Sequence, residues 1–248
     1  MSKDGKPMVK EKEGLVSRID HSRRYSRNMT TISQQEQELL KEKSVCVVGC
    51  GGLGGGVIEA LARMGVGHMT LVDGDCFDVT NLNRQVFSNE KNIGCSKACE
   101  AARQIEEINS EIDIKARDVM LDGDNAASLV KDHDVVVDAL DNISARRILE
   151  EACEEEGIPL VHGAIAGWTG QVAVITPGCR LMENLYGGFS PGETGEEKET
   201  GNPSFTPAVV SGIQAAETVK LLLGREGSLT GRLLMMDLLE HQYELIEL

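Results

Sequence analysis

A glycine-rich turn is the first feature of this sequence that could bind a phosphate group. It lies at residues 49–54, directly after an apolar run that starts at Val45, and its spacing is GxGxxG. Glycines in such a turn let the backbone approach a phosphate at the N-terminus of a helix. The glycines concerned are Gly49, Gly51, Gly52 and Gly54. The next apolar run ends at Asp73, where a carboxylate can accept hydrogen bonds from ribose hydroxyls. These residues predict a site for a nucleotide with an unphosphorylated ribose.

Two cations after Asp73 distinguish between the nucleotides that such a turn could hold. Arg84 and Lys97 follow it along the chain. The pyrophosphate of a dinucleotide can be held mostly by backbone amides and the helix dipole, whereas a triphosphate needs further cations. We therefore predict ATP, and an NAD-dependent oxidoreductase remains the alternative from a different enzyme class.

The elements that must position these residues alternate between short apolar strands and amphipathic helices. This alternation is typical of βαβ units and a parallel sheet. We expect strands at Val45–Gly49, Met69–Asp73, Asp113–Val119, Asp134–Leu140, Pro159–Ala164 and Gln171–Thr176, and a hairpin within Leu233–Glu247. The sequence thus predicts an α/β fold: a Rossmann-like, mainly parallel sheet flanked by helices, with antiparallel strands at the C-terminal end.

The expected helices have recognisable ends. They span Gly54–Gly65, Ser96–Asn109, Asn125–Lys131, Ser144–Glu156 and Ala208–Leu222. Ser144 is the expected N-cap of its helix. Ser33 and Glu36 have the spacing of a capping box and predict an earlier helix.

Three segments make up the expected domain organisation. Residues 1–20 are polar and of mixed charge, which predicts a flexible extension, and residues 21–248 form one domain. A stretch rich in Gly, Pro, Glu and Thr, about 178–206, is expected to cross over the active site. Within it we expect Leu181–Asn202 to be mobile until a partner binds.

Composition excludes several classes of function. The net charge of −15 argues against nucleic acid as a partner. No apolar run is long enough to cross a bilayer, and the N-terminus lacks the apolar region of a secretory signal. An odd number of cysteines, seven, fits a reducing compartment better than a disulfide framework. We expect a cytoplasmic protein without a membrane partner.

Several spaced motifs together resemble one family. They are Arg24-Tyr25-Ser26-Arg27, the GxGGLG turn, Asp73-Gly74-Asp75, Asn81-Leu82-Asn83-Arg84-Gln85, Lys97 and Asp141-Asn142. Their order resembles the ThiF/MoeB/HesA family, which is similar to the adenylation domains of ubiquitin-activating enzymes. The resemblance implies an ATP-dependent adenylyltransferase that activates the C-terminal carboxylate of a ubiquitin-like sulfur-carrier protein and releases pyrophosphate. The carrier would end in a Gly-Gly tail and serve thiamin, molybdopterin or related sulfur transfer, with a sulfurtransferase as a further partner.

The resemblance also implies a role for single residues. Asp73 would bind the ribose, and Asp141 would hold Mg²⁺ near the phosphates. The triphosphate would be lined by Asn81, Arg84, Gln85 and Lys97. Arg27 would reach into the neighbouring subunit's site in a homodimer. Taken alone, Arg27 fits a surface cation equally well, and Asp141 fits a helix cap.

Other polar residues near the site are expected to be structural. We expect Asp75 and Asp78 to shape the turn after Asp73. His162 is expected to be a hydrogen-bonded core residue. No catalytic role is predicted for any of the three.

The chain departs from the family at its cysteines. Many relatives carry two CxxC pairs that bind a structural zinc, but here only Cys179 remains near the first position, so we predict no structural zinc. Some relatives also have a cysteine in the crossover loop, and residues 180–206 contain none. This absence argues against covalent transfer of the carrier, while adenylation itself needs no thiol.

Two alternatives remain close to this family. One is a branch resembling the tRNA threonylcarbamoyladenosine dehydratases. The negative net charge of the chain and the motif at Arg24–Arg27 argue against it. The other is the inactive partner subunit of a heterodimeric activator. Inactive subunits typically lack the phosphate-binding or metal-binding positions, whereas this chain keeps Arg84 and Asp141.

Overall fold

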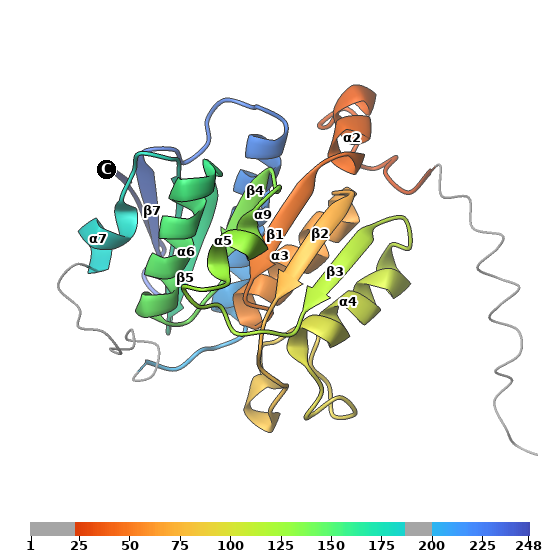
Figure 1. The fold of residues 1–248 in the computed structure, drawn as a ribbon. Helices are drawn as coiled ribbons and strands as arrows, with labels where there is room; N and C mark the ends of the chain where they lie inside the picture. Colours follow the sequence, from red (N-terminus) through yellow and green to blue (C-terminus); the bar gives the residue numbers. More distant parts are fainter. Residues whose placement is uncertain (1–22, 187–199) are drawn as a thin grey trace, which may run out of the picture.

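An eight-stranded sheet organises the chain in the order β3-β2-β1-β4-β5-β6-β7-β8 (Figure 1). The computed structural model describes residues 23–186 and 200–248. The expected flexible extension, residues 1–20, therefore lies outside the described residues.

The first five strands are parallel. They are β1 (Ser44–Val48), β2 (His68–Val72), β3 (Asp113–Arg117), β4 (Val135–Asp138) and β5 (Leu160–Ala166). Val45 of β1 lies opposite Met69 of β2 on one side and Val135 of β4 on the other. The chain order reverses between β1 and β4, and ligands of open α/β sheets bind at such a switch point, beyond the carboxyl ends of the strands.

The C-terminal strands are antiparallel, as the sequence predicts. They are β6 (Thr169–Ile175), β7 (Arg232–Asp237) and β8 (Gln242–Glu247). Strands β7 and β8 form the expected hairpin, with the turn at residues 238–241.

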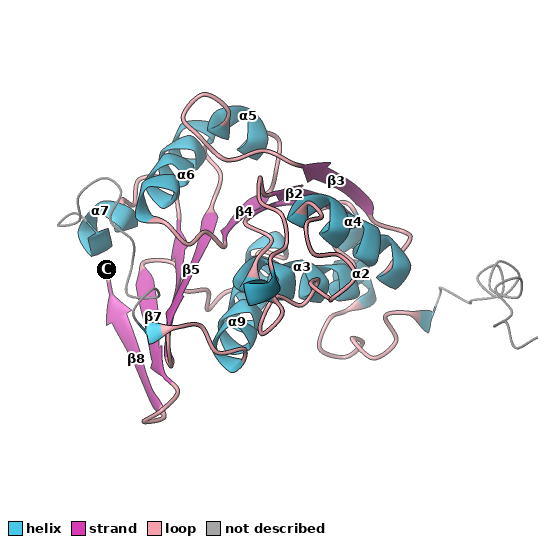
Figure 2. Cartoon of the chain, turned by 90° about the horizontal axis from the view of Figure 1, so that it is seen from below, coloured by secondary structure: helices cyan, strands magenta, loops and turns pink. Residues whose placement is uncertain are grey.

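Helices cover both faces of the sheet (Figure 2). One layer holds α3 (Gly52–Met64), α4 (Lys97–Ile108) and α9 (Phe205–Leu222), which share one hydrophobic core. The other layer holds α5 (Ala126–Val130), α6 (Ile143–Glu156) and α7 (Leu181–Tyr186), which pack on a second core. The apolar runs of β1 and β4 are therefore buried on both faces, as is typical of parallel strands between two helix layers.

The helix starts match the expected capping in one case and correct it in another. Ser33 and Glu36 form the predicted capping box at the start of α2 (Gln34–Lys41). Helix α6, however, begins before the predicted cap Ser144. Asn142 has an extended backbone, and its side chain accepts a hydrogen bond of 2.8 Å from the amide of Ala145. Asn142 is therefore the N-cap, because its side chain reaches the free amide of the first turn.

The expected crossover loop contains ordered structure at its start. Residues 181–186 form helix α7, in which Leu181 and Met182 are buried against the core beside α6. This corrects the expectation of a mobile segment from Leu181 onward, because two apolar side chains offset the entropy of ordering. Residues 187–199 of this loop lie outside the described residues.

Candidate active site

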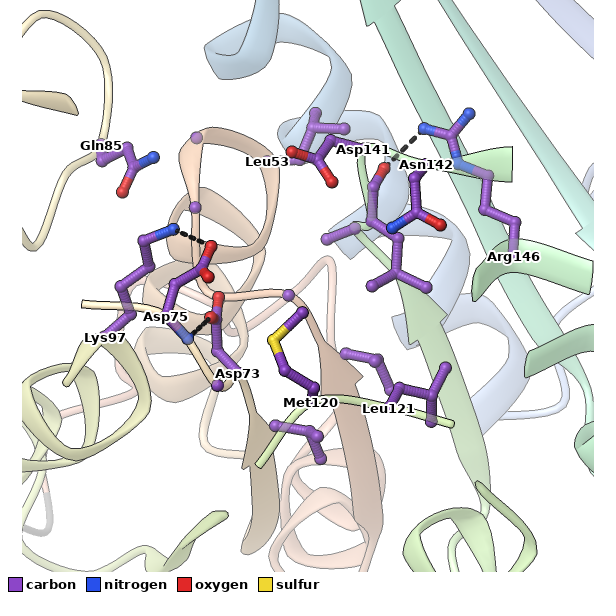
Figure 3. Close-up of a pocket in the computed structure, with 18 of the residues that line it drawn as sticks. Leu53, Asp73, Asp75, Gln85, Lys97, Met120, Leu121, Asp141, Asn142 and Arg146 are labelled. Carbon is purple, nitrogen blue, oxygen red and sulfur yellow. Dashed lines mark hydrogen bonds and ion pairs between the residues drawn. The ribbon is translucent and has the colours of Figure 1, made fainter. Parts of the chain in front are cut away.

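A cavity of about 500 Å³ opens beyond the carboxyl ends of β1, β2 and β4 (Figure 3). It lies at the switch point of the sheet. Its lining includes most of the residues to which the sequence assigns chemistry: Gly49, Gly51, Gly52, Asp73, Arg84, Gln85, Lys97 and Asp141.

The glycine turn between β1 and α3 has no room for side chains at two positions. Gly49 has a φ of 98°, and a Cβ there would lie 2.5 Å from the carbonyl oxygen of Ala139. A Cβ on Gly54 would lie 1.7 Å from the carbonyl oxygen of Gly49. Gly51 caps α3 without any side-chain hydrogen bond. The first turn of α3 therefore presents backbone amides at the cavity, which favours an anion.

Asp73 connects the glycine turn to the end of β2. Its carboxylate accepts a hydrogen bond of 2.7 Å from the amide of Cys50 and one of 2.8 Å from the amide of Asp75. Burial raises the pKa of this carboxyl group, while the hydrogen bond from Cys50 and the charge of Lys97 oppose that rise. Because Asp73 also lines the cavity, its remaining lone pairs are available to ribose hydroxyls.

Lys97 enters the cavity from the N-terminus of α4. Its ammonium lies 2.8 Å from the carboxylate of Asp75, and the Lys97 side chain is 10% exposed against 59% for Asp75. Asp75, a predicted turn residue, is thus also the counter-ion of the predicted phosphate-binding lysine. Figure 3 shows this ion pair beside Asp73.

The segment after β2 brings Arg84 and Gln85 to the cavity beside the glycine turn. A 3₁₀ turn at Val79–Asn81 precedes them, and its cap is Asp78, whose predicted role in the turn is confirmed. The guanidinium of Arg84 donates to the carbonyl of Thr80 over 3.1 Å. The side-chain oxygen of Gln85 is buried and has no hydrogen-bond partner in the described part of the chain, so it can receive a donor from a ligand.

Asn81 differs from its neighbours in position. Its side-chain oxygen accepts a hydrogen bond of 2.9 Å from the amide of Asp78, and the residue is 9% exposed. It does not line the cavity. Asn81 therefore supports the turn that presents Arg84, and its contact with the triphosphate stays a prediction.

Asp141 faces the cavity from the loop after β4. It makes no hydrogen bond or ion pair with other residues in the ranges 23–186 and 200–248. The neighbouring loop is fixed, because Asn142 caps α6 and Arg146 donates to the carbonyl of Leu140 over 2.5 Å. An unpaired carboxylate on a fixed loop is a hard oxygen donor, which fits Mg²⁺ held by one carboxylate and by phosphate oxygens.

An apolar wall completes the cavity and was not predicted from the sequence. Val119, Met120 and Leu121 line it between β3 and α5. The backbone approaches closely here, since a Cβ on Gly74 would lie 2.6 Å from the amide nitrogen of Met120. Such a wall beside a ribose-binding carboxylate can contact the face of a purine base. Met120 and Leu121 lie in an irregular segment, where periodicity gives no signal.

Arg27 lies at the other end of α3 from this cavity. Tyr25 is buried against Gly65 at the end of α3 and receives a hydrogen bond of 2.9 Å from Asn109. Arg27 itself is exposed. Because α3 has 13 residues, about 20 Å separate Arg27 from the glycine turn of the same chain.

His162 belongs to a buried polar cluster behind the cavity. Its Nδ1 lies 2.7 Å from the carboxylate of Asp138, and its Nε2 lies 3.2 Å from the side-chain nitrogen of Gln171. Gln171 also donates to the hydroxyl of Tyr186. Burial lowers the pKa of His162, and the hydrogen bond to Asp138 opposes this. The predicted role as a hydrogen-bonded core residue is confirmed.

The described residues contain neither a cluster of metal ligands nor a membrane-spanning helix. Over the described ranges, no group of three or more His, Cys, Asp or Glu side chains could hold a metal ion, and the absence of a structural zinc remains a prediction. No helix of the described residues is long and apolar enough to span a bilayer.

Comparison with known proteins identifies the family. The pattern of the ThiF family matches residues 25–248. The chain belongs to the ThiF family. The cavity described above thus lies in the ThiF-family part of the chain.

Curated ThiF-like relatives share more than a third of the sequence. The chain is 37% identical over 226 residues to the SAMP-activating enzyme E1 of Haloferax volcanii, an alignment that covers 90% of this chain and 84% of that protein. It is 36% identical over 234 residues to the sulfur carrier protein adenylyltransferase of Thermus thermophilus, covering 89% and 84%. It is 37% identical over 218 residues to the adenylyltransferase and sulfurtransferase MOCS3 of Culex quinquefasciatus, but spans only 50% of that longer protein.

Solved structures share the fold of this ThiF-family chain. The structure of E. coli MccB with ATP superposes with a TM-score of 0.76 at 21% identity, covering 90% of this chain and 70% of MccB. MccB alone gives a TM-score of 0.78 at 22% identity, covering 92% and 70%. The α/β fold predicted from the sequence is confirmed.

Proposed function

We propose that this protein is an ATP-dependent adenylyltransferase that activates the C-terminal carboxylate of a ubiquitin-like sulfur-carrier protein and releases pyrophosphate. One observation carries the proposal. The cavity brings together a phosphate-binding turn, a ribose-binding carboxylate and the cations Arg84 and Lys97 in a ThiF-family chain. Relatives at 36–37% identity are named as a SAMP-activating enzyme E1 and as a sulfur carrier protein adenylyltransferase.

ATP would bind with its base and its phosphates on different walls. The base would contact Met120 and Leu121, and the ribose would be held by Asp73. The phosphates would lie over the first turn of α3, within reach of Arg84 and Lys97. Lys97 would exchange Asp75 for a phosphate oxygen, because the exposed carboxylate of Asp75 can return to water when the ligand arrives.

The chemistry requires charge neutralisation more than proton transfer. A carrier carboxylate attacks the α-phosphorus, and negative charge develops on the departing pyrophosphate. Arg84 and Lys97 would stabilise that charge. Mg²⁺, held by Asp141, would supply a further positive charge at the phosphates. A terminal carboxylate is already ionised at neutral pH, so the site needs no general base.

The carrier's tail would enter at the wall made by Ile165 and Asn202. Both residues line the cavity on the side of the antiparallel strands. Asn83 donates to the carbonyl of Asn202 over 3.0 Å, which fixes this wall to the segment that carries Arg84. A Gly-Gly tail suits such a position, because a chain without side chains can approach the phosphates closely.

A homodimer would complete the site. Arg27 has no partner among the described residues, and it lies about 20 Å from the cavity of its own chain. Arg27 would instead act in the cavity of a second subunit, where it would meet the phosphates together with Arg84 and Lys97.

The biological setting follows the same proposal. All seven cysteines are free thiols, which supports the cytoplasm as the compartment. A sulfurtransferase would act on the activated carrier, as the domain pairing in the name of MOCS3 suggests. Thiamin, molybdopterin and related sulfur-transfer pathways are all compatible with this site.

Pyrophosphate exchange tests the activity directly. Purified protein is incubated with ATP, Mg²⁺, labelled pyrophosphate and candidate carriers that end in Gly-Gly, and label in ATP is measured. We expect exchange only with a cognate carrier that has a free C-terminal carboxylate. A carrier amidated at its C-terminus is the matched control and should give none. Failure of every candidate carrier, together with tight binding of NAD, would instead favour an oxidoreductase.

A further inference from the structure

A second groove lies on the face of the sheet that carries α5 and α6. Its volume is about 310 Å³, and it is lined mostly by polar residues from the start of β1, from β2 and β3, and from the end of α5. Strand β3 is the edge of the sheet, and its residues alternate between exposed and half-buried. Ile114 and Ala116 pack on the core beneath α4. Lys115 and Arg117 therefore point to the opposite face of the sheet, the face that carries α5. Helix α5 does not cover this part of β3.

Three cations converge on this groove. Lys115 and Arg117 come from β3, and Lys131 is the C-cap residue of α5. None of the three forms an ion pair or side-chain hydrogen bond within the described residues, although several other basic residues of the chain are paired. Unpaired positive charges gathered in one groove contrast with the overall net charge of −15.

The carboxylates of the groove are fewer than its cations. They are Asp113 and Asp132. Asp113 lies opposite His68 in the strand register, with 3.5 Å between its carboxylate and the imidazole. Arg117 lies four residues farther along β3, about 13 Å away. The Arg117 end of the groove is thus the part in which positive charge is least compensated.

Two partly buried hydrogen bonds of His133 fix one side of the groove. His133 Nδ1 lies 3.0 Å from the carbonyl of Val130, so this nitrogen donates. Its Nε2 lies 2.8 Å from the hydroxyl of Thr70, a residue that is 7% exposed and lies opposite Lys115 in the register. The segment that carries Lys131 is therefore held against the strand that neighbours Lys115.

We propose that this groove is a second anion site, which binds a small molecule through its phosphoryl groups. Arg117 offers a planar fork of donors and the two lysines offer point charges, a combination that suits an anion with several oxygens. The volume exceeds that of a single phosphate and fits pyrophosphate or a nucleoside monophosphate. If the proposed function holds, pyrophosphate is released when the carrier is adenylated, and AMP is released when a sulfur nucleophile later displaces it from the acyl-adenylate.

The test uses the imidazoles of His68 and His133 as local reporters in the full chain. Their proton NMR signals are assigned with the variants His68→Gln and His133→Gln. Pyrophosphate, AMP and sulfate are titrated separately at constant ionic strength. We expect saturable shifts with pyrophosphate or AMP, and much weaker shifts with sulfate. Tighter binding of pyrophosphate would identify a free oligophosphate as the ligand, whereas tighter binding of AMP would identify a nucleotide.

Two variants with equal charge changes locate the site. Lys115→Gln/Arg117→Gln should weaken binding at least about tenfold, since two ionic contacts are lost. Lys41→Gln/Arg63→Gln removes two exposed cations elsewhere and should bind as the wild type does. Unchanged binding in the groove variant, equal shifts with sulfate, or no saturable shift would overturn the proposal. Pyrophosphate exchange at saturating ATP should persist in the groove variant, which separates this outcome from a failure of the proposed function.

Discussion

Lys97 and Asp75 form an ion pair of 2.8 Å at the edge of the cavity, with the lysine almost fully buried and the aspartate largely exposed. The ion pair positions the ammonium of Lys97, yet the lysine can still exchange Asp75 for another anion. An exposed carboxylate is readily rehydrated, whereas a buried ammonium needs a replacement anion. A phosphate oxygen is such a replacement.

Asp141→Ala and Arg84→Ala should each reduce carrier-dependent pyrophosphate exchange by about 10² to 10³. Both side chains face the cavity and neither supports the core. Asp124→Ala and Arg63→Ala are the matched controls, since both residues are exposed and outside the cavity. Circular dichroism checks folding, and near-normal exchange by either folded cavity variant would contradict the assigned site.

Arg27→Ala and Lys97→Ala subunits, each inactive alone, should regain activity when they are mixed. In a two-fold symmetric dimer with random exchange, one composite site keeps both cations, which gives about a quarter of the wild-type sites. The measurement is pyrophosphate exchange after the subunits are unfolded and refolded together. Mixing Lys97→Ala with Arg84→Ala is the control, because these residues share one cavity and no intact site results. Full activity in a monomer, shown by sedimentation, would rule out a shared site.

The free energy of unfolding should fall between pH 7 and pH 5 in part because of His162. Burial lowers its pKa below the ordinary 6.5. At a pH just below 6.5, the imidazole is therefore protonated in the unfolded chain but neutral in the folded chain. The loss therefore begins as the pH falls below 6.5 and amounts to at most about 1.4 kcal/mol per pH unit. Denaturant unfolding at several pH values measures it. His162→Gln should show a shallower slope than the wild type, whereas His68→Gln, at an exposed position, should not.

The activated carrier should remain an acyl-adenylate. Residues 180–206 contain no cysteine. Burial raises the pKa of Cys46 to about 12 and raises those of Cys50, Cys153 and Cys179 as well, which makes these thiols poor nucleophiles. Hydroxylamine or sulfide should release the carrier from AMP. Intact-protein mass spectrometry after incubation with ATP and carrier should show no adduct, and a thiol-sensitive adduct on any cysteine would overturn this mechanism.

The sequence predicts those parts of the site that local chemistry determines. The turn at Gly49 and the carboxylate at Asp73 are recognisable because backbone geometry requires their residue types at that spacing. The sequence predicts a mainly parallel sheet but not the order of its strands. Parallel strands with crossover helices allow few arrangements, but more than one.

Other parts depend on tertiary contacts and have no local signature. Met120 reaches the cavity only because the irregular segment after β3 passes close to Gly74. Asn81 has a residue type suited to phosphate, yet its own turn uses the side chain. Helix α7 was not predicted, because it is stabilised by two buried side chains, Leu181 and Met182, within the otherwise polar crossover loop.

The two hydrogen bonds that Asp73 accepts affect how related sequences should be interpreted. This carboxylate holds the glycine turn to β2 even without a nucleotide, so selection for folding alone would preserve it in a descendant that had lost ATP. Asp141 supports no other residue within the described ranges. Substitutions at this position would therefore accumulate once selection for catalysis ended. Among homologues, an aspartate at the position of Asp141 is therefore a better marker of an active enzyme than an aspartate at the position of Asp73.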